Sequence, residues 1–181
     1  MAIRQLRYNQ DPILRKRCKE VKEVNDRIRL LLEDMLDTLH HTENAAALAA
    51  NQVGIVKRLV VIDYCDRLLK LVNPQIIESS GIQECMEGCL SFPGRFVKIT
   101  RPQRVTVRAL NEYGEEIRIS GENEMAKCLC HEIGHLDGEI FLDKAIEEDE
   151  NEGSCPPVFG KASCNGVGGR MQPIRGMADE R

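Results

Sequence analysis

The chain has 181 residues, of which 42% are hydrophobic and 30% are charged, and its net charge is −4. This composition is typical of one globular domain with its own core, and the negative charge excludes a broad basic surface, so we predict no specific nucleic-acid binding. The first residues contain no apolar run of signal-peptide length, and no later segment approaches the ~20 apolar residues of a membrane span. We therefore expect a cytoplasmic protein with no membrane partner.

The first predicted element is an amphipathic helix over residues 25–40, with Asn25 as a suitable N-cap. Its apolar residues recur at helical spacing and share one face: Ile28, Leu31, Leu32, Met35, Leu36 and Leu39. The next segment, Leu48–Gly54, consists mainly of small residues, which let a main chain lie against a peptide as an extra strand. Its Gln52 can donate to a developing oxyanion. The same segment also fits the C-terminal end of a helix that runs into a loop.

The middle of the chain predicts β-structure. Short runs rich in β-branched residues indicate strands near residues 58–64, 70–73 and 96–100. From Val105 to Ile119 apolar and polar residues alternate, and the alternation is interrupted by a turn sequence at residues 111–114. This pattern predicts a hairpin with one buried face.

A second helix is predicted to begin between Ser120 and Asn123 and to end at Gly138. Its apolar positions are Met125, Cys128, Leu129, Ile133 and Leu136. Beyond residue 146 no periodicity survives, and the sequence becomes rich in glycine and acidic residues. We therefore predict one catalytic domain over residues 1–146 and a disordered tail over residues 147–181.

The second helix contains the motif His131-Glu132-Ile133-Gly134-His135. Two imidazoles four residues apart lie on one helical face, where they can bind one metal ion, and the glutamate between them can reach a water on that metal. Taken alone, the motif fits a surface helix with two unrelated histidines equally well. A catalytic metal site also needs a third protein ligand and a position open to water.

Eight cysteines are present, with no CxxC pair that would indicate a structural zinc site. Without a secretory signal we expect free thiols, and we expect Cys18, Cys65 and Cys128 to be small buried hydrophobes. Cys89 differs because Gly88 precedes it, which lets the backbone approach a ligand closely and lets a following amide point at an oxyanion.

Together, three segments resemble the signature motifs of peptide deformylases, metal hydrolases that remove the formyl group from the N-terminal methionine of nascent bacterial proteins. The segments are Leu48–Gly54, Glu87–Ser91 and His131–Gly138, in this order, and the resemblance covers most of residues 5–146. It implies an α+β fold in which antiparallel or mixed β-sheets pack around a central metal-binding helix that carries HExxH, with an N-terminal amphipathic helix. It also implies release of formate from formyl-methionyl nascent peptides, at the ribosome, by a monomer.

The resemblance assigns roles to individual residues. Cys89, His131 and His135 become the metal ligands, Glu132 the acid and base, and Gln52 and the N–H of Leu90 the oxyanion donors. The implied ion is Fe²⁺ in the cell, with Zn²⁺, Ni²⁺ or Co²⁺ able to replace it. The pocket for the substrate methionine, next to His131, is expected to be lined by Ala46, Ala47, Cys85, Glu87, Met125 and Cys128. Gly88 and Arg101 are expected to support the site.

The chain departs from the family pattern at two places in these motifs. Ala45 and Ala47 stand where the family usually has glycine, and alanine would be strained there if φ were positive. Gly134 stands where the family usually has aspartate. A glycine inside the helix costs ~1 kcal/mol relative to alanine, and here it also removes a carboxylate from the neighbourhood of Glu87 and Arg101. We expect Glu87 and Arg101 still to pair with each other.

These departures keep two other functions open. One is a weakened homologue that binds peptide N-termini without turnover, and the intact candidate ligands argue against it. The other is an HExxH metalloprotease, for which no downstream third-ligand motif is evident.

Overall fold

The computed structural model describes residues 2–148, with the backbone alone for residues 147 and 148. The predicted disordered tail therefore lies almost wholly outside the described residues. In chain order the elements are η1 (Pro12–Arg15), α1 (Asp26–His40), β1 (Ala47–Ala49), η2 (Ala50–Val53), β2 (Leu59–Tyr64), β3 (Arg67–Ser80), β4 (Gln83–Cys89), β5 (Phe92–Arg101), β6 (Arg104–Leu110), β7 (Glu116–Glu122), α2 (Glu124–Leu136), η3 (Phe141–Lys144) and β8 (Ala145–Glu148).

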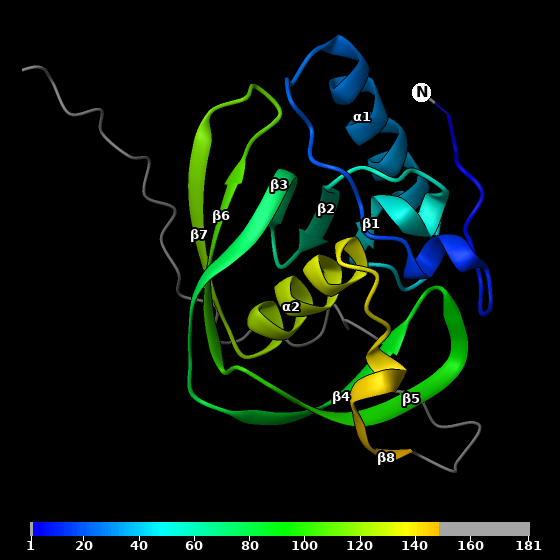
Figure 1. The fold of residues 1–181 in the computed structure, drawn as a ribbon, viewed down its shortest axis with the longest axis vertical. Helices are drawn as coiled ribbons and strands as arrows, with labels where there is room; N and C mark the ends of the chain where they lie inside the picture. Colours follow the sequence, from blue (N-terminus) through cyan, green and yellow to red (C-terminus); the bar gives the residue numbers. More distant parts are fainter. Residues whose placement is uncertain (1, 149–181) are drawn as a thin grey trace, which may run out of the picture.

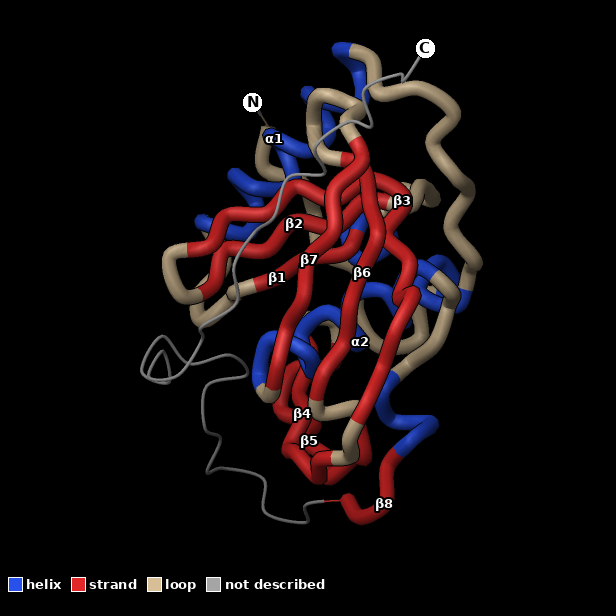
Figure 2. The backbone as a smooth tube through the Cα atoms, turned by 90° about the vertical axis from the view of Figure 1, so that its left-hand side faces the viewer, coloured by secondary structure: helices blue, strands red, loops and turns tan. Residues whose placement is uncertain are grey.

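The strands form two antiparallel sheets, which makes the fold α+β. The larger has the order β1-β2-β3-β6-β7, and the smaller has the order β4-β5-β8. Helix α2 lies between the two sheets and contacts strands of both (Figure 1). The view turned by 90° shows β6 and β7 in front of α2, with β4 and β5 below it (Figure 2).

Both faces of the larger sheet are buried at strand β2. Val60 and Ile62 belong to the same hydrophobic cluster as the apolar residues of α2. Leu59 and Val61 point to the opposite face and belong to the cluster formed by α1. This accounts for the continuous apolar run of β2, because a strand covered on both faces has no polar side. The two helices thus hold β2 and its neighbours between them.

The helices begin and end at recognisable signals. The Asn25 side chain accepts a hydrogen bond from the Ile28 N–H at 3.2 Å, which caps α1. Helix α2 begins at Glu124, directly after β7 ends at Glu122, so Ser120 belongs to the strand and not to the helix. After α2, Gly138 has φ +78°, and a Cβ there would lie 2.5 Å from the Arg15 carbonyl oxygen, so only glycine fits. In the described residues no helix is long and apolar enough to cross a membrane.

The predicted strands and hairpin are present, but the structure extends them and adds others. The run at residues 70–73 is part of β3, which has 14 residues, and the run at residues 96–100 is part of β5. Strands β1 and β4 were not predicted. Neither has an alternating β-branched pattern, and both are fixed by pairing, β1 with β2 and β4 with β5.

Candidate metal centre

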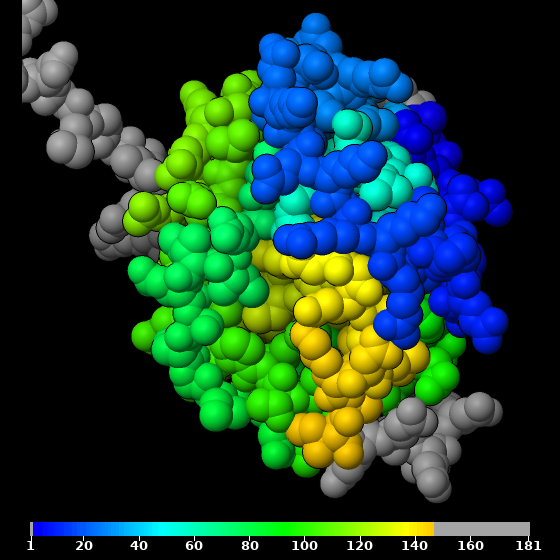
Figure 3. All heavy atoms as spheres, viewed as in Figure 1, coloured from blue at the N-terminus to red at the C-terminus, as the bar shows by residue number. Residues whose placement is uncertain are grey.

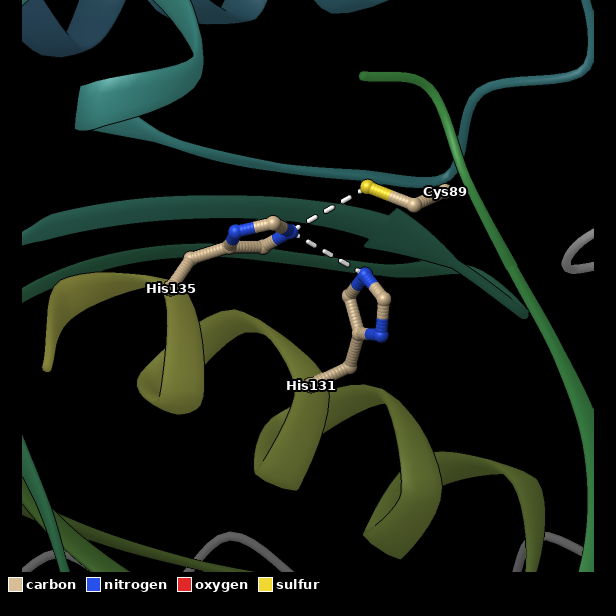
Figure 4. Close-up of side chains that lie close together, drawn as sticks. All are labelled: Cys89, His131 and His135. Carbon is tan, nitrogen blue, oxygen red and sulfur yellow. Dashed lines mark hydrogen bonds between the residues drawn. The ribbon is translucent and has the colours of Figure 1, made fainter. Parts of the chain in front are cut away.

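Helix α2 presents His131 and His135 on one face, one turn apart. Their Nε2 atoms lie 3.2 Å from each other, and the rings meet edge to face with centroids 4.8 Å apart. Both side chains are buried, at 4% and 1% exposure. The histidine spacing in the sequence therefore yields two imidazole nitrogens that converge on one point (Figure 4).

Cys89 reaches the same point from the end of β4. The pairing of β4 with β5 changes register between Gly88 and Cys89, and the irregularity turns the cysteine toward α2. Its Sγ lies 3.2 Å from Nε2 of His135 (Figure 4). The three candidate ligand atoms all lie within 4.8 Å of one another, and all three residues are buried. One thiolate and two imidazoles suit a zinc-like or ferrous divalent ion.

Glu87 and Arg101 support His131 from behind. Arg101 donates from Nε to Oε1 of Glu87 at 2.7 Å and from Nη2 to Oε2 at 2.9 Å, as predicted for this pair. His131 Nδ1 lies 2.9 Å from Oε2 of the same carboxylate. Burial alone would raise the pKa of Glu87, but the hydrogen bonds from Arg101 and His131 outweigh it and lower the pKa to about 2. The carboxylate is therefore charged and orients the His131 ring.

The pKa values of the two imidazoles are shifted in opposite directions. Burial opposes protonation of His131, but its contacts with Cys89 and Glu87 prevail and raise its pKa. His135 has its pKa lowered by burial and by the neighbouring charge of His131. A neutral His135 is the form that can donate a lone pair to a metal.

Glu132 is the acidic residue of the motif, and it is 2% exposed. Among the described residues its Oε2 has no hydrogen-bond partner. Burial raises the pKa of Glu132 to about 7, with the charge of His131 acting in the opposite direction. A carboxyl group with this pKa can both accept and return a proton at neutral pH.

Helix η2 presents Gln52 to the cysteine. The Ala49 N–H donates to Oε1 of Gln52 at 2.9 Å, which fixes the amide with Nε2 facing the site. Nε2 lies 3.4 Å from Sγ of Cys89 and 3.1 Å from Oγ of Ser91. Leu90 follows Cys89 directly and is partly buried. The amide of Gln52 is therefore a fixed donor next to the Cys89 thiol, and Leu90, whose N–H is the predicted second donor, follows that cysteine in the chain.

The residues predicted to line a methionine pocket lie on three elements. Ala46 and Ala47 are buried at the start of β1, and Cys85 is partly buried on β4. Met125 and Cys128 of α2 belong to the main core cluster. A Cβ on Gly121 would lie 2.7 Å from Cγ of Met125, so Met125 packs against β7.

The departures from the family pattern are tolerated without backbone strain. Neither Ala45 nor Ala47 has a positive φ, so alanine costs little at these positions. A Cβ on Gly134 would find Oε2 of Glu139 at 3.4 Å. A carboxylate from the loop after α2 therefore lies close to the position where the family usually has an aspartate.

Sequence reasoning missed two buried residues near the site. Asn51 is fully buried, and its Nδ2 donates to the carbonyl oxygen of His135 at 2.6 Å. Lys127 is 5% exposed, donates to the Met86 carbonyl oxygen at 3.2 Å and pairs with Glu124 at 2.6 Å. Lys127 lies outside the apolar stripe of the helix, where a lysine is ordinarily exposed, so the sequence contained no signal of its burial.

Much of α2 is covered by other parts of the molecule. In the space-filling view the yellow atoms of this region lie between the blue N-terminal segment and the orange atoms of η3 and β8 (Figure 3). His131 also packs against Phe141 of η3, with ring centroids 5.6 Å apart. Of the cysteines in the described residues, those with free thiols are Cys18, Cys85, Cys89, Cys128 and Cys130. Cys65 is partly buried and disulfide-bonded, so the expectation of a free, buried thiol was wrong for this residue.

Comparison with known proteins identifies the family. The model of the polypeptide deformylase family matches residues 3–151. The chain belongs to this family. Its relatives include peptide deformylase 2 of Clostridium acetobutylicum, which is 56% identical over 147 residues, covering 81% of this chain and 98% of that protein. The peptide deformylase of Acetivibrio thermocellus is 50% identical over 155 residues, covering 84% of this chain and 91% of that protein.

Solved deformylase structures share the fold. The peptide deformylase of Thermotoga maritima matches with a TM-score of 0.77 and 35% identity, over 80% of this chain and 99% of that one. A peptide deformylase of Ehrlichia chaffeensis in complex with actinonin matches with a TM-score of 0.77 and 36% identity, over 80% of this chain and 89% of that one. Deformylases are metal-dependent enzymes, and the cluster of Cys89, His131 and His135 provides a group that could hold a metal ion.

Proposed function

We propose that this deformylase family member hydrolyses the N-formyl group of N-terminal formyl-methionine on nascent polypeptides and releases formate. We propose Cys89, His131 and His135 as ligands of one divalent metal ion. The observation that supports this most is the convergence of their three ligand atoms within 4.8 Å. The buried Glu132, whose pKa is raised to about 7, supplies the base on the same helix.

When bound, the ion supplies Lewis-acid chemistry and lowers the pKa of a coordinated water. In the proposed reaction, Glu132 takes a proton from the attacking water as the new bond to the formyl carbon forms. Glu132 then returns the proton to the departing amine when the C–N bond breaks. Its unpartnered Oε2 is available for this transfer, because the described residues do not occupy it.

The oxyanion that develops on the formyl oxygen needs fixed donors. We assign this role to Nε2 of Gln52 and to the N–H of Leu90. The Gln52 amide is held by the Ala49 N–H, so it does not have to reorient during the reaction. Glu87 and Arg101 are assigned as supports of His131, with Gly88 allowing the turn that carries Cys89.

The ion is proposed to be Fe²⁺ in the cell, replaceable by Zn²⁺, Ni²⁺ or Co²⁺, because a thiolate with two imidazoles accepts all four. Helix α2 is then the central metal-binding helix of the fold, and α1 is the N-terminal amphipathic helix. We also propose that residues 1–146 form the catalytic domain, and that the chain acts as a cytoplasmic monomer on peptides that leave the ribosome.

The substrate methionine is proposed to bind between α2 and β4. Ala46, Ala47, Cys85 and Cys128 would supply small or apolar contacts, with Met125 behind them. Glu87 also borders this region, but both of its oxygens are engaged by Arg101 and His131. Because the Glu87 carboxylate is already hydrogen-bonded, the pocket would offer mainly apolar contacts to the thioether side chain of the substrate methionine.

Formate release tests the proposal. Protein purified without oxygen and loaded with Fe²⁺ or Ni²⁺ is incubated with formyl-Met-Ala-Ser and, as a control, with acetyl-Met-Ala-Ser. We expect formate from the first peptide and no acetate from the second. Internal cleavage would instead identify a protease, and binding without turnover would identify a weakened homologue.

A further inference from the structure

Two unpartnered polar atoms remain at the site after Glu132 is accounted for. In the described part of the chain they are Oδ1 of Asn51 and Nδ1 of His135, both on side chains that are at most 1% exposed. Buried polar atoms in native proteins nearly always have a partner, and each exception needs an explanation. One of these atoms is an acceptor, and the other can carry a proton.

The two atoms belong to residues that already touch each other. Nδ2 of Asn51 donates to the carbonyl oxygen of His135 at 2.6 Å and to that of Leu14 at 3.3 Å. Donation to two carbonyl oxygens settles which end of the amide is nitrogen, because the flipped amide would place three oxygens together. Oδ1 is therefore an acceptor on a side chain that is bonded to the His135 backbone, and in this structure it forms no hydrogen bond with Nδ1 of the His135 ring.

The ring of His135 is used at one edge only. Its Nε2 faces Cys89 and His131, whereas Nδ1 lies on the opposite side of the ring and points away from both (Figure 4). In His131 the corresponding Nδ1 is bound by Glu87 at 2.9 Å. A histidine that binds a metal through one nitrogen commonly donates from the other to a carboxylate, a carbonyl group or water, and this contact sets its tautomer and orientation.

We propose that Asn51 is the positioning residue of His135. In the metal-loaded protein, Nδ1–H of His135 donates to Oδ1 of Asn51, and the lone pair of Nε2 faces the ion. The inference rests on the proposed metal site. The two histidines are then held differently, His131 by a charged carboxylate and His135 by a neutral amide. Two adjacent residues of η2 thus contact two different candidate ligands, since Gln52 faces Cys89 and Asn51 contacts His135 at the end of α2.

A different partner for Nδ1 is a water molecule. His135 borders a small cavity of about 10 Å³, which is the room one water needs, and Glu139 also lines it. The test must therefore separate the amide oxygen from this cavity. It must also separate the acceptor of Asn51 from its donor, because Nδ2 has a structural role of its own.

Two substitutions make these separations. Asn51→Asp keeps an acceptor oxygen and removes the donation to the two carbonyl groups, whereas Asn51→Leu removes both. Asn73→Ala is the control for general destabilisation, because Asn73 makes two 2.8 Å hydrogen bonds with the backbone of Val21, away from the site. Full-length chains labelled with ¹⁵N are loaded with Zn²⁺. The exchange of the His135 Nδ1 proton is measured by NMR, and Zn²⁺ affinity is measured by competition with a chelator.

We expect a slowly exchanging Nδ1 proton in the wild type, in Asn51→Asp and in Asn73→Ala. In Asn51→Leu we expect that resonance to be lost to exchange and Zn²⁺ affinity to fall ~10–100-fold. Wild-type exchange and affinity in Asn51→Leu would overturn the inference in favour of the cavity water. Equal losses in Asn51→Asp and Asn51→Leu would overturn it in favour of a purely structural donor. A His135→Ala variant with undiminished Zn²⁺ affinity would defeat the metal site itself, and this inference with it.

Discussion

Substituting Arg101 with methionine should destabilise the protein strongly. The guanidinium is 8% exposed and the Glu87 carboxylate 1%, and two hydrogen bonds of 2.7 and 2.9 Å join them. Methionine keeps the apolar stem but leaves a buried carboxylate with His131 as its remaining charged partner. Breaking a buried ion pair by removing one member costs about 3–5 kcal/mol. For a chain of this size, such a loss lowers Tm by roughly 10 °C.

Urea unfolding measures this loss, and the chain offers a matched control. Arg104 forms the same kind of pair with Glu122 at 2.9 Å, but the two side chains are 61% and 55% exposed. Arg104→Met should therefore cost less than ~1 kcal/mol. A second variant, Glu87→Gln combined with Arg101→Met, should recover part of the loss because the unpaired buried charge is gone.

The reasoning would be refuted if Arg101→Met and Arg104→Met had equal free energies of unfolding. The metal content of each variant is measured in the same samples. We expect Arg101→Met to bind less metal, because Glu87 and Arg101 hold His131 and the β4 strand that carries Cys89. Unchanged metal content and activity in Arg101→Met would remove this supporting role.

Three further predictions follow from the same site. Glu132→Gln should lower kcat/KM by at least ~10²–10⁴-fold with metal content unchanged, as steady-state kinetics and metal analysis would show; near wild-type activity would exclude Glu132 as the base. Since the pKa of Glu87 is lowered from 4.5 to about 2, its stabilising effect is complete above pH 4.5 and is lost as pH falls toward 2; this amounts to ~3 kcal/mol, and acid unfolding of Glu87→Gln should lack that part of the pH dependence. Gly134→Ala should raise the free energy of unfolding by up to ~1 kcal/mol, because the added methyl would make ordinary contacts with Glu139, at 3.4 Å from Oε2 and 3.8 Å from Cβ; a lower Tm would mean that the Glu139 side chain cannot accommodate it.

The elements that local sequence determines were predictable. Strand β2 and the β6–β7 hairpin follow from β-branched runs and alternation, and the structure contains both. Strand β7 continues to Glu122, into the range where the second helix was expected to begin. Strand β1 was not predictable, because Ala47, Leu48 and Ala49 have no strand preference and become a strand by pairing with Val60 to Ile62. Strand β4 contains polar residues and a glycine, and pairing with β5 likewise determines it.

The candidate site divides in the same way. The histidine pair is a local feature, since four residues along a helix make one turn. Cys89 and Gln52 reach the pair from distant parts of the chain. Their own chemistry and neighbours made them candidates, but the family resemblance, not their spacing, assigned them to the same site as the histidines. Asn51 was missed because its contact with the His135 carbonyl oxygen joins residues 84 positions apart. No local pattern marks such a contact.

The central claim is that Cys89, His131 and His135 hold one metal ion. Equilibrium dialysis with Zn²⁺, followed by metal analysis, measures the number of ions bound per chain. Cys130→Ala is the matched control for Cys89→Ala, because Cys130 is also a buried free cysteine and lies next to His131. We predict one ion per chain in the wild type and in Cys130→Ala, and almost none in Cys89→Ala at the same free Zn²⁺ concentration. One tightly bound ion in Cys89→Ala would contradict the account.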